Sequence, residues 1–130
     1  MSNLVITERQ VKGVTILDMS GKITLGENSN ALRIAIRQLL GDGKTKILLN
    51  MGNVGHIDSS GLGEIVSGFS TVNREGGSLK LLNLTTHIND LLVLTKLLTV
   101  FDAFENEDDA VNSFNDEASV NEPLRSAFTV

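Results

Sequence analysis

The segment that most constrains the fold is the run Lys46-Ile47-Leu48-Leu49-Asn50-Met51, which is apolar on both of its alternating faces. A strand of this kind is usually covered on both sides, which places it in the middle of a sheet. After residues 52–57, the polar triplet Asp58-Ser59-Ser60 runs directly into apolar residues at helical spacing, namely Leu62, Ile65, Val66, Phe69 and Val72. The order predicts a strand, a loop and a helix, with polar groups at the junction where α/β sheets usually meet ligands and partners.

The residues before this unit predict a β-hairpin and a first helix. Leu4–Arg9 and Val14–Ser20 are β-prone runs separated by a short glycine-containing gap, which favours antiparallel pairing. Gly21 is expected to end the second strand. Thr24 and Glu27 have the spacing of a capping box, which predicts a helix start. The expected helix carries a buried stripe of Leu32, Ala35, Ile36, Leu39 and Leu40.

The residues after the unit predict two further strands and two further helices. Ser78–Leu84 is predicted as a strand, Thr85-Thr86 as the cap of a third helix, and Leu98–Phe101 as a last short strand. Glu107–Phe114 is predicted as a short terminal helix whose acidic first turn suits the positive end of the helix dipole. The order is β-β-α-β-α-β-α-β-α. It closes most naturally as an α/β fold with a mixed central β-sheet of four to five strands packed with about four α-helices.

Length and charge indicate one domain with an acidic end. The chain has 130 residues, 41% of them hydrophobic, which is enough for a single core. We expect a domain over residues 1–114 and an acidic C-terminal tail over residues 115–130. The last 26 residues hold seven acidic residues against one base, Arg125. The chain has no basic patch, five Phe and no Trp or Tyr, so we expect no direct binding to nucleic acid.

Several other functional classes lack their sequence signals. The chain has no cysteine and two histidines, so we expect neither a metal site nor a cofactor. It has no leader-like start and no apolar run near 18 residues, so we expect a cytoplasmic protein without membrane insertion. Residues 57–61 read I-D-S-S-G rather than a nucleophile elbow, and the glycines near Gly41 lack phosphate-loop spacing. These patterns predict a protein that is not an enzyme.

Several of these features together resemble a known family. They are the β-β-α opening, the Gly21-Lys22-Ile23 turn, the strand Ile47 to Met51, the sequence I-D-S-S-G-L-G entering a helix, and the strand G-G-S-L-K-L. Over about residues 3–114 the chain resembles a STAS domain and, more narrowly, an anti-sigma factor antagonist. The resemblance implies a small switch protein that binds an anti-sigma factor serine kinase and so frees a sigma factor for transcription. In that family the serine directly after the aspartate is phosphorylated, which breaks the complex, and a serine phosphatase restores it. The matching residue is Ser59.

The residues around Ser59 are the predicted partner-binding surface. Its predicted members are Asp58, Ser60, Gly61, Leu62, Gly63 and Thr24. Ser60 is expected to cap the helix and Asp58 to be a neighbouring charge. Thr24 stands where antagonists often carry an acidic residue, in a G-x-[LI]-D arrangement.

Glycines within the predicted helix need an explanation of their own. Each glycine inside a helix costs about 1 kcal/mol relative to alanine. We favour the close approach of a partner as the reason for Gly61 and Gly63. For Gly68, close packing of the helix on its own sheet is an equally good explanation.

Three other interpretations of the sequence stay open. The polar triplet at residues 58–60 is also what simple helix capping requires. A STAS subunit of a transport or signalling assembly would keep the fold without the phosphorylation. A small-molecule or nucleotide-binding module would use the same polar junction for a ligand.

Overall fold

The computed structural model describes residues 4–115, so most of the predicted tail, residues 116–130, lies outside the described residues. The described part contains a five-stranded sheet in the order β1-β2-β3-β4-β5. The elements are β1 (Leu4–Val11), β2 (Val14–Ile23), α1 (Glu27–Gly41), β3 (Lys46–Ile57), α2 (Ser59–Arg74), β4 (Ser78–Leu82), α3 (Thr86–Leu94) and β5 (Ala103–Phe104). Residues 107–115 form a further helical segment at the C-terminal end. The predicted fold class, a mixed sheet packed with about four helices, is confirmed.

The central position of β3 is confirmed as well. β1 and β2 form the predicted antiparallel hairpin, and the remaining neighbours, β2 with β3, β3 with β4 and β4 with β5, are parallel. Ile47, Leu48 and Leu49 are fully buried. An apolar run without alternation is therefore explained by cover on both faces of the sheet.

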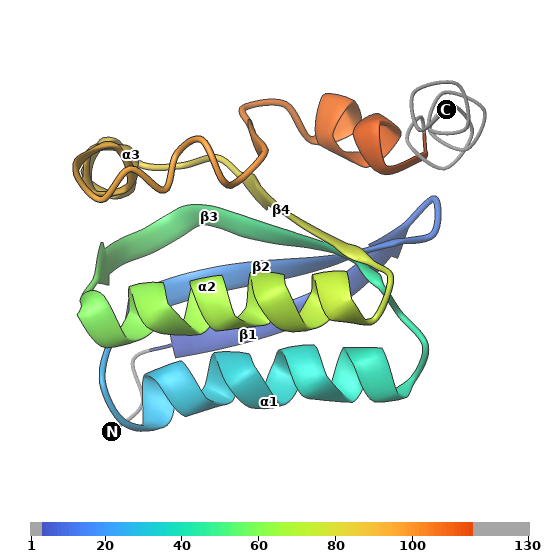
Figure 1. The fold of residues 1–130 in the computed structure, drawn as a ribbon, viewed down its shortest axis with the longest axis horizontal. Helices are drawn as coiled ribbons and strands as arrows, with labels where there is room; N and C mark the ends of the chain where they lie inside the picture. The colour runs from blue at the N-terminus through green and yellow to red at the C-terminus, as the bar shows by residue number, and fades with distance from the viewer. Residues whose placement is uncertain (1–3, 116–130) are drawn as a thin grey trace, which may run out of the picture.

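The two faces of the sheet have separate cores. Helices α1 and α2 lie side by side on one face (Figure 1), over a core that includes Leu32, Ile36, Ile65 and Val72. On the other face the C-terminal helical segment packs on β2, β3 and β4. This second core contains Val14, Ile16, Leu48, Leu82, Ala110, Val111 and Phe114. The segment is thus part of the packed structure, although short helices have little stability alone.

Three strands are longer than the sequence predicted. β1 continues past Arg9 to Val11. β2 continues through Gly21 to Ile23, and β3 continues through residues 52–57 to Ile57, where the two strands still pair. The predicted strand end at Gly21 and the predicted loop at residues 52–57 were therefore wrong. Glycines favour turns locally. Here, however, β2 and β3 stay paired past the glycines, with a shift in their register next to Gly21. β4 ends at Leu82, two residues before the predicted end.

Helix α1 begins without the predicted capping box. Its N-cap is Gly26, at φ +100°, and no side chain caps it. The Thr24 carbonyl instead accepts a hydrogen bond from the Ser29 N–H at 3.1 Å. The capping-box prediction was wrong because the chain reaches α1 through a tight turn that depends on the positive φ of Gly26.

The C-terminal part differs from prediction at the last strand. Leu98–Phe101 is not a strand. Phe101 is buried, with its ring edge-on to Phe69 at 5.0 Å between centroids, and β5 follows at Ala103–Phe104. An apolar stretch can fill a core without pairing, which sequence alone does not distinguish. The terminal helix is confirmed over residues 107–115, and Asn106 caps it by accepting from the Asp109 N–H at 2.9 Å.

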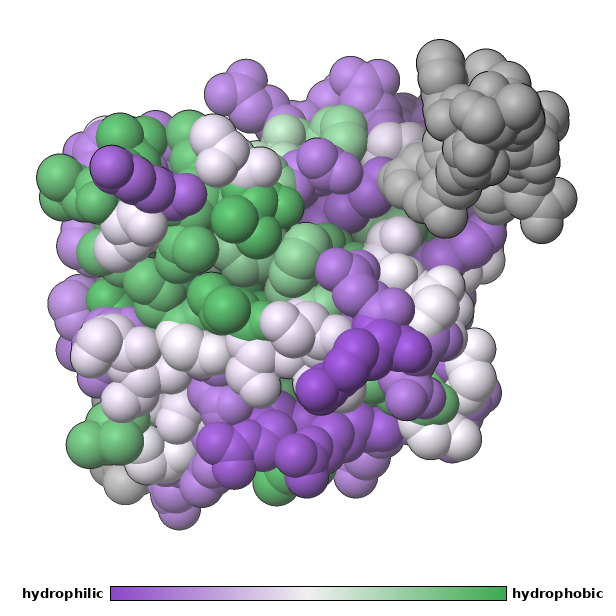
Figure 2. Space-filling view, in the orientation of Figure 1, coloured by the Kyte–Doolittle hydropathy of each residue, from purple (hydrophilic) through white to green (hydrophobic). Residues whose placement is uncertain are grey.

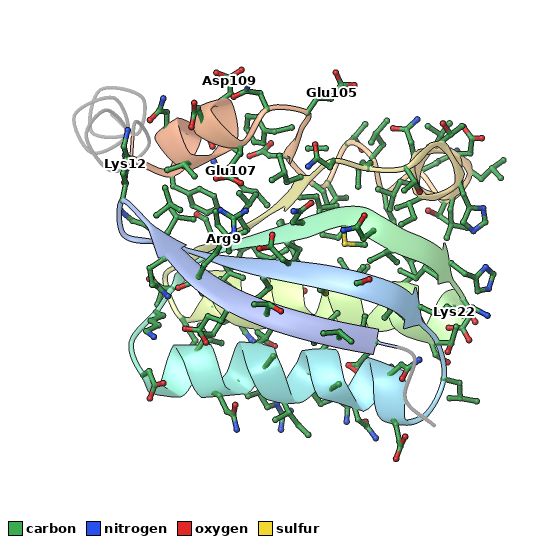
Figure 3. The ribbon with its side chains drawn as sticks, turned by 180° about the vertical axis from the view of Figure 1, so that it is seen from behind. Arg9, Lys12, Lys22, Glu105, Glu107 and Asp109 are labelled. Carbon is green, nitrogen blue, oxygen red and sulfur yellow. The ribbon has the colours of Figure 1, made fainter. Side chains whose placement is uncertain are left out.

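An ion cluster holds the C-terminal helical segment to the hairpin. Arg9 of β1 donates from Nε to Asp18 Oδ2 at 2.6 Å and from Nη1 to Glu107 Oε2 at 2.9 Å. Figure 3 shows the side chains of Arg9 and Glu107 meeting at the start of that segment. Hydrogen bonds from Arg9 are the main cause that lowers the pKa of both carboxylates. Asn50 of β3 donates to Asp18 at 2.8 Å, so the cluster also reaches the central strand.

We predict that Arg9→Ala lowers the free energy of unfolding by about 1–2 kcal/mol, since it removes charge-assisted bonds to two carboxylates that are only partly exposed. Carboxylates with lowered pKa contribute stability above their unfolded values, 3.8 for Asp18 and 4.5 for Glu107, and lose it as the pH falls further. Urea denaturation of the wild type should therefore show stability falling below pH 4.5. The slope should be smaller in Arg9→Ala, which lacks the donor to both carboxylates.

The exposed Lys44–Glu8 pair, at 3.1 Å, provides the matched control. Lys44→Ala should change stability by less than about 0.5 kcal/mol and keep the wild-type slope. Equal pH slopes in the wild type and Arg9→Ala would contradict the role given to the cluster.

Candidate functional site

The Asp58 carboxylate joins the start of α2 to the loop between β2 and α1. Its Oδ1 accepts from the Gly61 N–H at 2.9 Å, which makes Asp58 the N-cap of α2. Its Oδ2 accepts from the Leu25 N–H at 3.0 Å. These two backbone hydrogen bonds, that of Gly61 first, lower the pKa of Asp58. Asp58, and not Ser60 as predicted, is therefore the cap, because its extended backbone points the carboxylate back at the helix amides.

Ser59 is the first residue of α2 and its side chain is exposed, whereas Ser60 and Leu62 are partly buried. The structure thus brings Ser59 beside Asp58, and Asp58 holds the loop that contains Thr24 and Leu25. The positive end of the helix dipole and the free N–H groups of the first turn favour an anionic group at this position. A phosphoryl group on Ser59 would be compatible with the fold.

The glycines of α2 have different environments. A Cβ on Gly61 would lie 2.0 Å from the carbonyl oxygen of Ile23, so the chain's own β2 explains this glycine without a partner. A Cβ on Gly68 would lie 2.7 Å from Ile36 Cδ1 of α1, which supports packing within the domain as its reason. A Cβ on Gly63 would meet nothing within 4 Å. Among these three glycines, Gly63 alone is exposed.

A surface groove separates the first halves of α1 and α2. It is lined by Leu25, Gly26, Ser29, Asn30, Arg33, Ser60, Gly63, Glu64 and Ser67. Glu64 is only 8% exposed and accepts from Arg33 Nε at 3.0 Å and Nη2 at 2.7 Å, so this ion pair ties the two helices together. Neither the groove nor the exposure of Leu25 was predicted from the sequence. The available signal was a leucine that follows Thr24 and stands outside every apolar periodicity.

His56 lies at the end of β3 and not in the predicted loop. Its ring stacks on that of His87, at the start of α3, with 5.5 Å between centroids. Lys22 is opposite His56 in the pairing of β2 with β3. Within residues 4–115, no group of three or more acidic or histidine side chains is arranged to hold a metal ion. In the same range no helix is long and apolar enough to cross a membrane.

Comparison with known proteins decides the family. The model of the STAS domain matches residues 6–110, most of the chain. The chain belongs to the STAS domain family. The match includes the strand β3, the Asp58-Ser59 junction and the whole of α2.

Relatives of this STAS domain include anti-sigma factor antagonists. The anti-sigma F factor antagonist of Paenibacillus polymyxa is 26% identical over 110 residues, which cover 84% of this chain and 93% of the relative. A Thermotoga maritima protein, a candidate anti-sigma factor antagonist, has a similar structure with a TM-score of 0.76 and 24% identity, covering 85% and 94% of the two chains. The phosphorylated form of the Bacillus cell fate determinant SpoIIAA has a TM-score of 0.67 and 17% identity, covering 84% and 98%. The two structures support the fold.

We predict opposite effects for alanine at two glycines of the STAS domain that are one half-turn apart in α2. Gly61→Ala should cost about 2–3 kcal/mol of stability, because its methyl group would collide with the backbone of Ile23. Gly63→Ala should add about 0.5–1 kcal/mol, because its methyl group meets open space and alanine favours helix. Urea denaturation of both variants measures the difference. A Gly61→Ala protein as stable as the wild type would contradict the packing explanation.

We predict that Asp58→Ala lowers the urea midpoint and speeds hydrogen exchange at the Leu25 amide, because one carboxylate accepts from both Leu25 and Gly61. Asp58→Asn keeps one acceptor oxygen and should be intermediate. Because the pKa of Asp58 is lowered, the part of its contribution that depends on charge is present above pH 3.8 and is lost on further acidification, so the wild type should approach Asp58→Asn there. If hydrogen exchange at the Leu25 amide is the same in Asp58→Ala as in the wild type, the Asp58 carboxylate does not hold the loop that contains Leu25.

Proposed function

We propose that this STAS domain protein is an anti-sigma factor antagonist, a cytoplasmic regulator rather than an enzyme. It binds an anti-sigma factor serine kinase and is released when that kinase phosphorylates Ser59, and a serine phosphatase restores binding. The observation that carries the proposal is the exposed hydroxyl of Ser59 on the first turn of α2, directly after the capping Asp58. The Paenibacillus polymyxa relative, named an anti-sigma F factor antagonist, supports the choice of partner class.

The energetics of a phosphoserine at this position favour loss of the partner over loss of the fold. Phosphorylation adds about −1.5 to −2 charges, and a helix N-terminus favours such a charge by roughly 0.3–1 kcal/mol. A partner carboxylate about 6 Å away would oppose each unit of charge by roughly 3 kcal/mol at an effective dielectric near 20, before salt screening. Since about 1.4 kcal/mol is a factor of ten, the complex would weaken by roughly a hundredfold or more.

The neighbours of Ser59 have different parts in the proposed complex. Ser60, Leu62, Gly63 and the loop at Thr24 would contact the partner directly. Asp58 would act mainly by fixing that loop to α2. Gly61 would have an internal role, because its missing side chain lets α2 approach the backbone of β2.

We predict that the cognate kinase and ATP add one phosphoryl group to the wild type and to Ser60→Ala, and none to Ser59→Ala. Intact-mass measurement gives the number of groups on each protein. The phosphorylated wild type, and Ser59→Glu to a smaller extent, should bind the kinase at least tenfold more weakly than the unmodified protein.

Thermal unfolding of the phosphorylated protein shows whether phosphorylation weakens only the binding of the kinase or also the fold. Its melting temperature should stay within a few degrees of the unmodified protein, because the helix N-terminus accepts the charge. A wild type that acquires no phosphoryl group would contradict the proposed switch. Phosphorylation that persists in Ser59→Ala would mean that another hydroxyl is the phosphorylated group.

A further inference from the structure

We propose that the groove between α1 and α2 is the docking surface for the anti-sigma factor kinase. It would receive a segment of the partner that places an apolar side chain against Leu25 and an acidic side chain against Arg37. This inference rests on the proposed function, and it extends the contact from the start of α2 to the exposed face of α1. Figure 1 shows α1 and α2 running side by side, and residues of both helices line the groove.

Leu25 is the apolar end of the surface. Its side chain is 78% exposed, yet its backbone is fixed by the bond to Asp58 Oδ2. The flanking carbonyls are used as well, that of Thr24 by the Ser29 N–H and that of Gly26 by the Asn30 N–H, both at 3.1 Å. Because the backbone of this loop is already fixed, covering Leu25 with a partner requires little further ordering of the loop.

The middle of the groove allows close approach to α2. Ser60, Gly63 and Ser67 line it from α2, and Ser29 and Asn30 line it from α1. These side chains are small or absent, and the space beside Gly63 is open. In Figure 2 the surface over α1 and the adjoining side of α2 is mostly polar, whereas a separate apolar region lies between α2 and α3. A partner segment in the groove would therefore meet hydroxyl and amide groups, with Leu25 as its apolar contact.

The far end of the groove carries positive charge. Arg33 is half exposed and paired with the buried Glu64, so these two charges nearly cancel. A second, smaller hollow adjoins the groove at Arg33, Glu64 and Ser67, and its other lining residues are Ile36, Arg37, Gly68 and Thr71. Arg37 is exposed and adds a guanidinium at this end. Complementary charge of this kind accelerates association and selects partners, so the fitting side chain is a carboxylate.

The first test compares matched pairs of variants in binding to the cognate kinase, using the full-length, unphosphorylated protein. Leu25→Ala should weaken binding about tenfold or more, whereas Ile34→Ala, which truncates another exposed side chain of 54% exposure outside the groove, should stay within about twofold. Arg37→Glu should weaken binding about tenfold or more. Lys12→Glu makes the same change of charge at the β1–β2 turn and should stay within about twofold.

Gly63→Ala separates binding from folding. Its methyl group enters the groove, so affinity should fall at least fivefold, about 1 kcal/mol by the usual conversion, while the protein melts at a higher temperature than the wild type. Reduced binding by a more stable protein cannot come from partial unfolding. Circular dichroism of all five variants should match the wild type.

The outcomes distinguish this inference from the proposed function. If the kinase does not bind the wild type, the proposed function fails. If the wild type binds and Ser59 phosphorylation releases it, but Leu25→Ala, Arg37→Glu or Gly63→Ala binds as the wild type does, the docking of the kinase in this groove is overturned and the switch stands. Docking in this groove is also overturned if Ile34→Ala weakens binding as much as Leu25→Ala, or if Lys12→Glu weakens it as much as Arg37→Glu.

Discussion

The two hydrogen bonds accepted by the Asp58 carboxylate connect the fold of this STAS domain to its candidate site. One bond begins α2 and the other holds the amide of Leu25, so the chain before α1 and the chain before α2 are fixed to one another. A hydroxyl on Ser59 and an apolar side chain on Leu25 thereby receive a defined spacing. Without this carboxylate, the loop that contains Leu25 would lose its side-chain connection to the start of α2.

The carboxylate can do this because the backbones around it are unusually close. The parallel pairing of β2 with β3 continues to Ile23 and Ile57, which delivers both chain segments to the same edge of the sheet. Gly61 then lets the first turn of α2 lie against the carbonyl of Ile23. The result is a rigid junction at the carboxyl ends of parallel strands, the usual position for contacts with ligands and partners in sheets of this kind.

The opposite end of the sheet has its own connection. Arg9 links the hairpin to Glu107, and the helical segment that follows covers the second face of the sheet. The charged groups near Ser59 are not those of the Arg9–Glu107 pair. A charge added at Ser59 would therefore act on the surface, while the two cores stay packed. This separation supports the proposed switch, since a phosphoryl group on Ser59 would change the local field and leave apolar burial unaltered.

The sequence alone determined those features that depend on neighbours in the chain. The unbroken apolar run at Ile47–Leu49 predicted a central strand, and helical spacing predicted α2 with the polar residues 58–60 at its start. The exact helix start was not predicted, because the cap was expected at Ser60 and lies at Asp58. The tertiary structure decided what depends on distant residues. The contact of Gly61 with β2, the bond from Leu25 to Asp58 and the groove between α1 and α2 all join segments that are far apart in sequence. Local patterns contain no record of such pairings, because the free energy that fixes them comes from packing the whole domain.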